Sequence, residues 1–171
     1  VDADGNTYMT AIFGNKIWMT ENLRVTHSPE GNELESFCYE NIPENCNEYG
    51  RLYSWETAMN GSLAERSQGI CPEGWHIPSD EEWKQLTDHF RPDPVAELRR
   101  TDGPFNCQYG GFKSASAGFY GIDLYADFWT STEAADNAWK RHLHIKYTTG
   151  FRYHGKKANA LSVRCVRDFL P

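Results

Sequence analysis

Five cysteines, widely spaced over 171 residues, constrain the fold of this chain more than any other feature. No two of them form a C-x-x-C pair, which argues against a zinc ribbon and against a thioredoxin-like redox motif. Wide spacing is typical of disulfides, which form in oxidising compartments. We expect Cys38 to pair with Cys46 across a short loop and Cys71 to pair with Cys165, which leaves Cys107 as an unpaired thiol.

The longer of these bridges would tie the middle of the chain to its end. Constraining so long a loop contributes ~4 kcal/mol or more in the chain-entropy description of disulfides. The length is that of one ordinary domain, and a hydrophobic content of 39% excludes wholesale disorder. We therefore expect a single disulfide-stapled domain over residues 1–171.

The charge pattern excludes some classes of partner. The net charge is −7 and the lysines and arginines are scattered, so there is no basic stripe for a nucleic acid. No apolar run approaches the ~20 residues of a membrane helix, so we expect no direct membrane insertion. The chain begins at Val1 without a signal-peptide pattern, as either a processed form or an excised domain would.

The first half of the chain predicts a hairpin and short helices. Alternating residues on either side of Gly14-Asn15 predict a β-hairpin over 7–19. Ser79 and Glu82 form a capping box that opens the clearest helix, with Trp83, Leu86 and Phe90 facing the core. Shorter helices are expected over 53–59 and 94–100, and an irregular segment over 26–50.

The second half predicts a long loop followed by strands. Residues 101–127 are rich in glycine and aromatic residues without sustained periodicity, which favours a loop. Short strands follow, at 128–131, 141–147, 150–153 and 162–167. A hairpin, then helices, then antiparallel strands indicate an α+β fold.

Several motifs in this order resemble a known family. They are the glycine, tryptophan and asparagine pattern from Ile12 to Leu23, then Tyr49-Gly50-Arg51-Leu52-Tyr53-x-Trp55, the stretch from Cys71 to Trp83, Phe128-Trp129-x-Ser131-Thr132-Glu133, and Ser162 to Asp168. Together they are similar to the Fibrobacter succinogenes major paralogous domain, across almost the whole chain.

The resemblance carries expectations about fold and location. The family is similar in turn to the C-type-lectin-like fold and its formylglycine-generating-enzyme branch, with two short helices and a closing strand whose cysteine pairs back across the core. It implies a secreted or surface protein of bacteria, often a lipoprotein, with adhesion or polysaccharide binding as its role. The chain departs from the family pattern at Gly111 to Gly118, where ligand choice would be decided.

Metal binding is considered at two places. The calcium triplet of sugar-binding lectins is missing, so no cofactor is required, but Asp123, Asp127, Glu133, Asp136 or Asn137 could build a different calcium site. A solvated acidic loop is the alternative interpretation. The segment from Asp2 to Asn6 resembles the start of a calcium loop without its closing glutamate, and is interpreted as a turn.

Catalysis is the weaker interpretation of the chain. A copper oxidase of the formylglycine-generating branch would need two cysteines near the C-terminal strand, and only Cys165 is there. An iron-type site would need His142 and His144, which share one face of a strand, to meet a third ligand such as His154 or His76. Cys107 lacks a marked partner. We therefore expect no enzyme activity.

Aromatic residues of the loop region provide the candidate ligand site. Flat rings stack on sugar faces while neighbouring acids accept hydroxyl hydrogen bonds. The expected function is a non-catalytic extracellular module that binds a glycan or a surface protein, with a purely structural module of a larger surface protein as the alternative. The expected ligand-binding residues are Tyr109, Phe119, Tyr120, Asp123, Tyr125 and Trp139.

Overall fold

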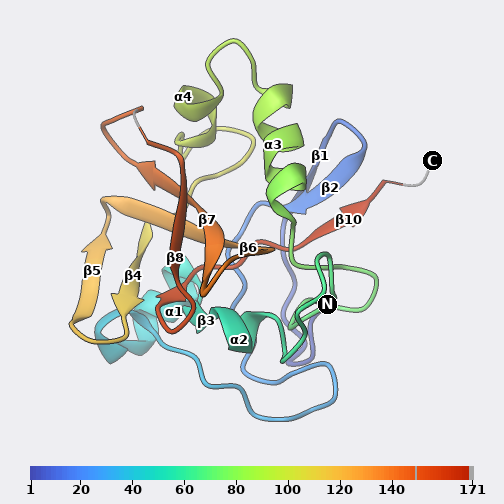
Figure 1. Ribbon diagram of the computed structural model, residues 1–171, viewed down its shortest axis with the longest axis vertical. Coiled ribbons are helices and arrows are strands. Elements are labelled where there is room, and N and C mark those ends of the chain that lie inside the picture. The colour runs from blue at the N-terminus through green and yellow to red at the C-terminus, as the bar shows by residue number, and fades with distance from the viewer. Residues whose placement is uncertain (149, 170–171) are drawn as a thin grey trace.

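Two β-sheets and a few short helices make up the fold, which confirms the α+β class (Figure 1). The computed structural model describes residues 1–148 and 150–169. The smaller sheet is antiparallel and places the last strand beside the second, with Val166 opposite Trp18. Its strands, in spatial order, are β1 (Thr10–Phe13), β2 (Lys16–Met19) and β10 (Val166–Asp168).

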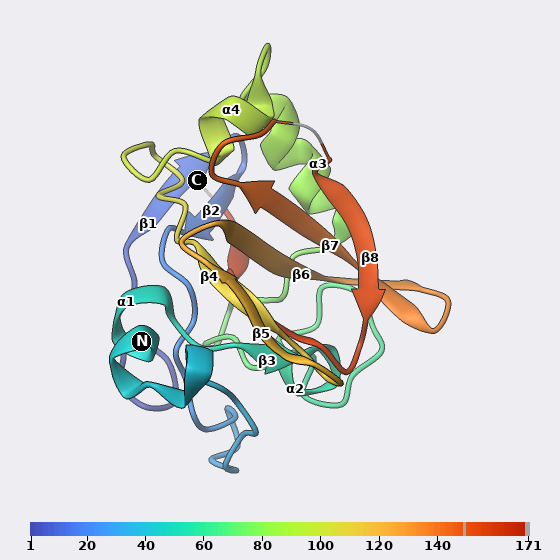
Figure 2. The ribbon, with the colours of Figure 1, turned by 90° about the vertical axis from the view of Figure 1, so that its left-hand side faces the viewer.

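The larger sheet has the strand order β3-β9-β4-β6-β7-β8, and β5 pairs with β4 outside this path. Asp127 of β6 lies opposite His142 of β7, and Lys140 of β7 lies opposite Tyr153 of β8. Figure 2 shows the β4–β5 hairpin in front of β6 and β7. The strands are β3 (Tyr53–Ser54), β4 (Gly110–Ser114), β5 (Gly118–Ile122), β6 (Tyr125–Ala134), β7 (Asn137–His144), β8 (Arg152–Lys156) and β9 (Ala160–Leu161).

Helix α3 (Asp80–His89) is the helix that the capping box predicted. The Ser79 hydroxyl accepts from the Glu82 backbone N–H, and the Glu82 carboxylate accepts from that of Ser79. Trp83 and Leu86 are buried, as expected from their spacing. Helices α3 and α4 (Pro94–Leu98) lie at one end of the larger sheet, and α2 (Trp55–Ala58) lies toward the other (Figure 1).

Both expected disulfides are present, and Cys107 is a buried free thiol. The first hairpin turns at Gly14-Asn15 as expected. In the initial turn, the Asp2 carboxylate accepts from the backbone N–H groups of Asp4 and Asn6. No helix among the described residues is long and apolar enough to span a bilayer.

The segment 26–50 is not wholly irregular, contrary to expectation. It contains a 3₁₀ turn, η1 (Tyr39–Asn41), and helix α1 (Pro43–Tyr49). Pro43 occupies the first turn of the helix, where its fixed φ is already helical. Only Cys46 of this helix is buried, so no apolar stripe marks it in the sequence.

The long loop expected over 101–127 is present only as far as residue 109. Residues from Gly110 onward form the β4–β5 hairpin and the beginning of β6. Most side chains of this hairpin are partly exposed on both faces, so the polar and apolar residues do not alternate as they do in a half-buried strand.

The later strands exist, with shifted bounds. The strand expected over 162–167 is broken because the chain crosses there from the larger sheet to the smaller one. Ser162 makes a single bridge to Phe128, and β10 begins at Val166. Between these points, Val163 and Cys165 accept hydrogen bonds from Leu23 and Met19 through their carbonyls.

The two disulfides should contribute unequally to stability. Cys71–Cys165 has a sequence separation of 94 and Cys38–Cys46 one of 8. Loop entropy then predicts losses in the free energy of unfolding of about 5 and about 2.5 kcal/mol for the double alanine variants C71A/C165A and C38A/C46A. Chemical denaturation measures both, and equal losses would contradict the loop-length explanation.

Candidate functional site

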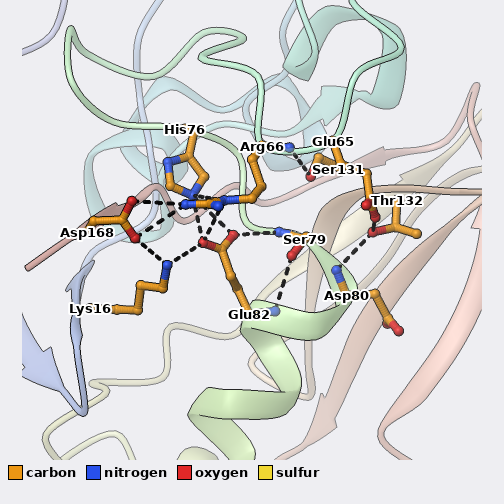
Figure 3. A network of polar contacts seen from close by, with 10 residues as sticks. All are labelled: Lys16, Glu65, Arg66, His76, Ser79, Asp80, Glu82, Ser131, Thr132 and Asp168. Atoms are coloured by element: carbon orange, nitrogen blue, oxygen red, sulfur yellow. Dashed lines mark hydrogen bonds and ion pairs between the residues drawn. The ribbon is translucent and has the colours of Figure 1, made fainter.

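A buried ionic network surrounds the Glu82 carboxylate, which is 4% exposed (Figure 3). Lys16 Nζ lies 3.0 Å from it, Arg66 Nε 3.1 Å and His76 Nε2 2.9 Å. Lys16 and Arg66 also pair with Asp168 of β10. The Glu82 carboxylate thus joins α3 to β2 and to the segment before α3, and Lys16 and Arg66 extend the network to β10.

The network has the perturbed acidity that often marks a functional site. Burial by itself would raise the pKa of Glu82, but hydrogen bonds from His76, the Ser79 backbone and Lys16 outweigh it and lower the pKa to about 2. Every charged group of the network is engaged by another member. We therefore interpret it as structural.

This pKa sets an expected acid dependence of stability. The Glu82 pKa in the folded chain lies below its ordinary value of 4.5, so its contribution is present above about pH 4.5 and is lost as the pH falls toward about 2. The full contribution is about 3 kcal/mol. We expect Glu82→Gln to lower the free energy of unfolding at neutral pH and to flatten its decline in acid.

Denaturant titrations of the wild type and variants from neutral to acidic pH measure this effect. Glu81→Gln, in the same helical turn but exposed, is the matched control and should cost less than about 1 kcal/mol. An unchanged acid transition in Glu82→Gln would contradict the assignment.

The expected ligand-binding residues do not form one site. Tyr109 is buried and its hydroxyl donates to the Arg99 carbonyl. Phe119 packs on Tyr39, with ring centroids 5.3 Å apart. Asp123 accepts from the Tyr49 hydroxyl at 2.6 Å, beside Tyr109 in a separate hollow of about 320 Å³.

Trp139 lies on the opposite face of β7 from His142. The Arg152 guanidinium covers its ring at 3.4 Å, and His154 meets the ring edge-on. Arg152 in turn pairs with Asp80 at the beginning of α3. Trp139 therefore belongs to the contact between the sheet and this helix.

Of the expected residues, Tyr125 belongs to an aromatic surface on the sheet, and Tyr120 adjoins this surface through Phe112 and Lys140. Tyr125 has its ring 5.1 Å from that of His142 and 5.4 Å from that of His144. His142 also meets Tyr153 at 5.9 Å. We name this surface the tyrosine–histidine face and define it as Tyr120, Tyr125, His142, His144, Tyr147 and Tyr153.

Two further residues connect Tyr120 to the rest of the face. Tyr120 stacks on Phe112, with ring centroids 5.6 Å apart. The Lys140 ammonium lies 5.5 Å above the Phe112 ring. Lys140 and His142 alternate with inward-facing Arg141 on β7, so both point to the same side of the sheet.

Asp127 lies beneath this face and is fully buried. It pairs with Lys140, and its carboxylate oxygens lie 3.1 and 3.2 Å from His142 Nδ1. A buried carboxylate that holds one ring nitrogen fixes the orientation of the imidazole and leaves Nε2 for other partners.

Two glycines leave the space that the rings of Tyr125 and Tyr153 occupy. A Cβ at Gly121 would lie 1.9 Å from the Tyr125 ring, and one at Gly150 would lie 1.9 Å from the Tyr153 hydroxyl. Both glycines have a positive φ, which L side chains rarely adopt. The rings therefore pack directly on backbone.

The acids expected to bind calcium are not brought together. Asp127 is under the face, Glu133 pairs with Lys157, and Asp136 is exposed in the β6–β7 turn. Neighbouring Asn137 is engaged with His154. Within residues 1–148 and 150–169 no three histidine, cysteine or carboxylate side chains are grouped as metal ligands are.

The iron-type site of His142, His144 and a third histidine is not assembled, although the first two residues do share a face. His142 and His144 share a face, as their spacing predicted, but His154 lies on the opposite side of the sheet and His76 is held by Glu82. Neither expected third ligand converges on the pair.

The Cys107 thiol is buried and unreactive in the folded chain. Burial raises the pKa of its thiol to about 12, although the Arg164 charge acts in the opposite direction. Because the thiolate is the reactive form, this cysteine is a poor nucleophile in the folded chain.

A second hollow lies beside α2, with a volume of about 520 Å³. Trp55 lines it, but this ring is buried and covered by the Lys157 ammonium at 4.4 Å. The hollow therefore offers a ligand little aromatic surface, and the tyrosine–histidine face remains the candidate site.

Tyr147 and Tyr153 were not among the residues expected to bind a ligand, and His142 and His144 were considered only as metal ligands. Alternation along 140–144 was the available signal. The alternation alone does not show which aromatic residues lie beside the histidines, because that depends on the register of β6 and β8 against β7.

The fold and this face describe an α+β domain, stapled by two disulfides, with an open aromatic sheet surface. Residues 12–167 match the family model of the Fibrobacter succinogenes major domain, and the chain belongs to this family. A comparison with curated proteins finds no match.

The motifs that carry the family resemblance serve mainly the core. Trp18, Trp55, Trp83 and Trp129 are buried, although Trp75 is only half-buried. Buried Arg164 joins two motifs through its hydrogen bond to Asn22. All members of the tyrosine–histidine face fall outside these motifs, so family membership identifies the scaffold more than the site.

Proposed function

We propose that this chain is a non-catalytic domain that binds a glycan through the tyrosine–histidine face. The observation that carries the proposal is the exposure of aromatic rings there: Tyr120 is 43% exposed, Tyr153 47% and Tyr147 61%. Tyrosines combine an apolar ring with a hydroxyl, which suits the apolar faces and hydroxyl rims of sugars. Tyr120 and Tyr153 also stand on paired strands, which hold their rings in fixed positions, and Tyr147 follows the end of β7.

The same face has polar groups suited to sugar hydroxyls. His142 and His144 lie between tyrosines, and Lys140 lies beside Phe112. Glycan sites combine such aromatic surfaces with a few placed polar groups. A surface protein is the alternative partner, and a purely structural module is the alternative role.

We further propose that the domain has a C-type-lectin-like fold and works outside the cell or at its surface. Support for the fold comes from the pairing of β2 with β10, the bridge from Cys71 to Cys165 beside the last strand, and the helices α2 and α3. Two disulfides support an oxidising compartment.

Glycan binding should depend on the tyrosines of the face. We expect wild-type protein to bind a subset of a glycan array and Tyr120→Ala/Tyr125→Ala to bind at least about tenfold more weakly, because stacking area is lost. Binding should be equal with calcium and with chelator, because Asp123, Asp127 and Glu133 are engaged elsewhere and Asp136 is exposed in a turn apart from them.

Trp139→Ala, on the opposite face, is the control variant and should keep its affinity. Thermal unfolding of each variant shows that it is folded. If the array shows no binding in either buffer, a protein-binding or structural role is favoured instead. If only Trp139→Ala loses binding, the ligand site lies on the face of β7 opposite the tyrosine–histidine face, which contradicts the proposal.

A further inference from the structure

We propose that the glycan is acidic and that His142 and His144 donate hydrogen bonds to its carboxylate or sulfate group. This inference rests on the proposed function and names the ligand class of the same site. Its basis is the charge distribution on the tyrosine–histidine face and the hydrogen bonds already made by each imidazole.

The charge on this face contrasts with that of the chain. The chain has a net charge of −7, yet the groups placed here are Lys140, His142 and His144 around one carboxylate. That carboxylate, Asp127, is fully buried and already neutralised by Lys140. An approaching anion would therefore meet imidazoles and tyrosines while the negative charge stays beneath them.

His144 is set as a donor at neutral pH. Its Nδ1 accepts the backbone N–H of Lys146 at 2.9 Å, so this nitrogen has no proton. The proton of the neutral ring is then on Nε2.

His142 has the opposite arrangement. Its Nδ1 faces the Asp127 carboxylate and carries the proton there, so Nε2 of the neutral ring is an acceptor. A second proton adds at Nε2, keeps the bond to Asp127, and turns Nε2 into a charged donor. Hydrogen bonds with a charged partner are about twice as strong as neutral ones.

Charged and titratable groups from three strands surround His142. The titratable and charged groups that face it are Asp127 and Tyr125 from β6, Lys140 and His144 from β7, and Tyr153 from β8. Lys140 and Asp127 cancel, so a protonated His142 adds one net positive charge. Histidine changes charge between about pH 5 and 8, so affinity for an acidic glycan should rise as the pH falls through this range.

The test uses isothermal titration calorimetry with three oligosaccharides of equal length: a neutral galactose oligomer, an oligogalacturonate and a sulfated oligosaccharide. Each is measured at about pH 5.5 and about pH 7.5, where both ligand anions stay ionised. We expect at least one acidic ligand to bind about tenfold more tightly than the neutral one at the lower pH and to lose most of this advantage at the higher pH. The two acidic arms distinguish a carboxylate from a sulfate.

His142→Gln keeps a polar side chain but cannot gain the charge, so its affinity for the acidic ligand should no longer depend on pH. His144→Gln should weaken binding at both pH values. His154→Gln, on the opposite face of β8, is the matched control and should behave like the wild type.

The outcomes separate this inference from the proposed function. Equal affinities for neutral and acidic ligands, or pH dependence that persists in His142→Gln, would overturn the acidic assignment and leave glycan binding intact. Binding to none of the three ligands, with a blank glycan array, would overturn both.

Discussion

The contacts of the Glu82 carboxylate with Lys16, Arg66 and His76 are the interaction on which the rest of the structure depends. It closes the capping box of α3 and contacts Lys16 of β2, His76 and Arg66. Lys16 and Arg66 also pair with Asp168 of β10. A buried carboxylate without partners would cost several kcal/mol, so these cations must remain in place together. Chain segments that are far apart in the sequence are thereby fixed around the beginning of one helix.

This anchor also fixes the candidate site, through strand β7. The side of β7 that faces α3 presents Trp139 and Arg141, and Arg141 pairs with Asp80 in the first turn of that helix. Because side chains alternate along a strand, securing one side determines that Lys140, His142 and His144 point to the other. Rigid positioning of the tyrosine–histidine face is thus a consequence of how the opposite side is packed.

Features set by nearby residues could be predicted from the sequence, and features set by strand register could not. The capping box at Ser79 and Glu82 predicted α3, and the short spacing of Cys38 and Cys46 predicted the first bridge. The long bridge from Cys71 to Cys165 was also expected, from the cysteine count and not from a local pattern. Helix α1 and the β4–β5 hairpin were missed because they bury too little to leave an apolar period. Of the residues expected to bind a ligand, Tyr120 and Tyr125 lie on the proposed face, whereas Tyr109 is buried and Trp139 lies on the opposite side of the sheet. Which tyrosines join His142 depends on pairings with β6 and β8 that no local pattern encodes.

Ligand binding at one sheet face, and at neither of the two hollows described above, is the central claim. The most direct measurement is a two-dimensional NMR titration of the folded domain with a glycan that it binds. The account predicts shifts in the amide and side-chain signals of β5, β6, β7 and β8 around Tyr125, His142 and Tyr153, with few changes elsewhere. Shifts centred on Trp55 and Lys157 beside α2, or on Tyr109 and Cys107, would contradict it.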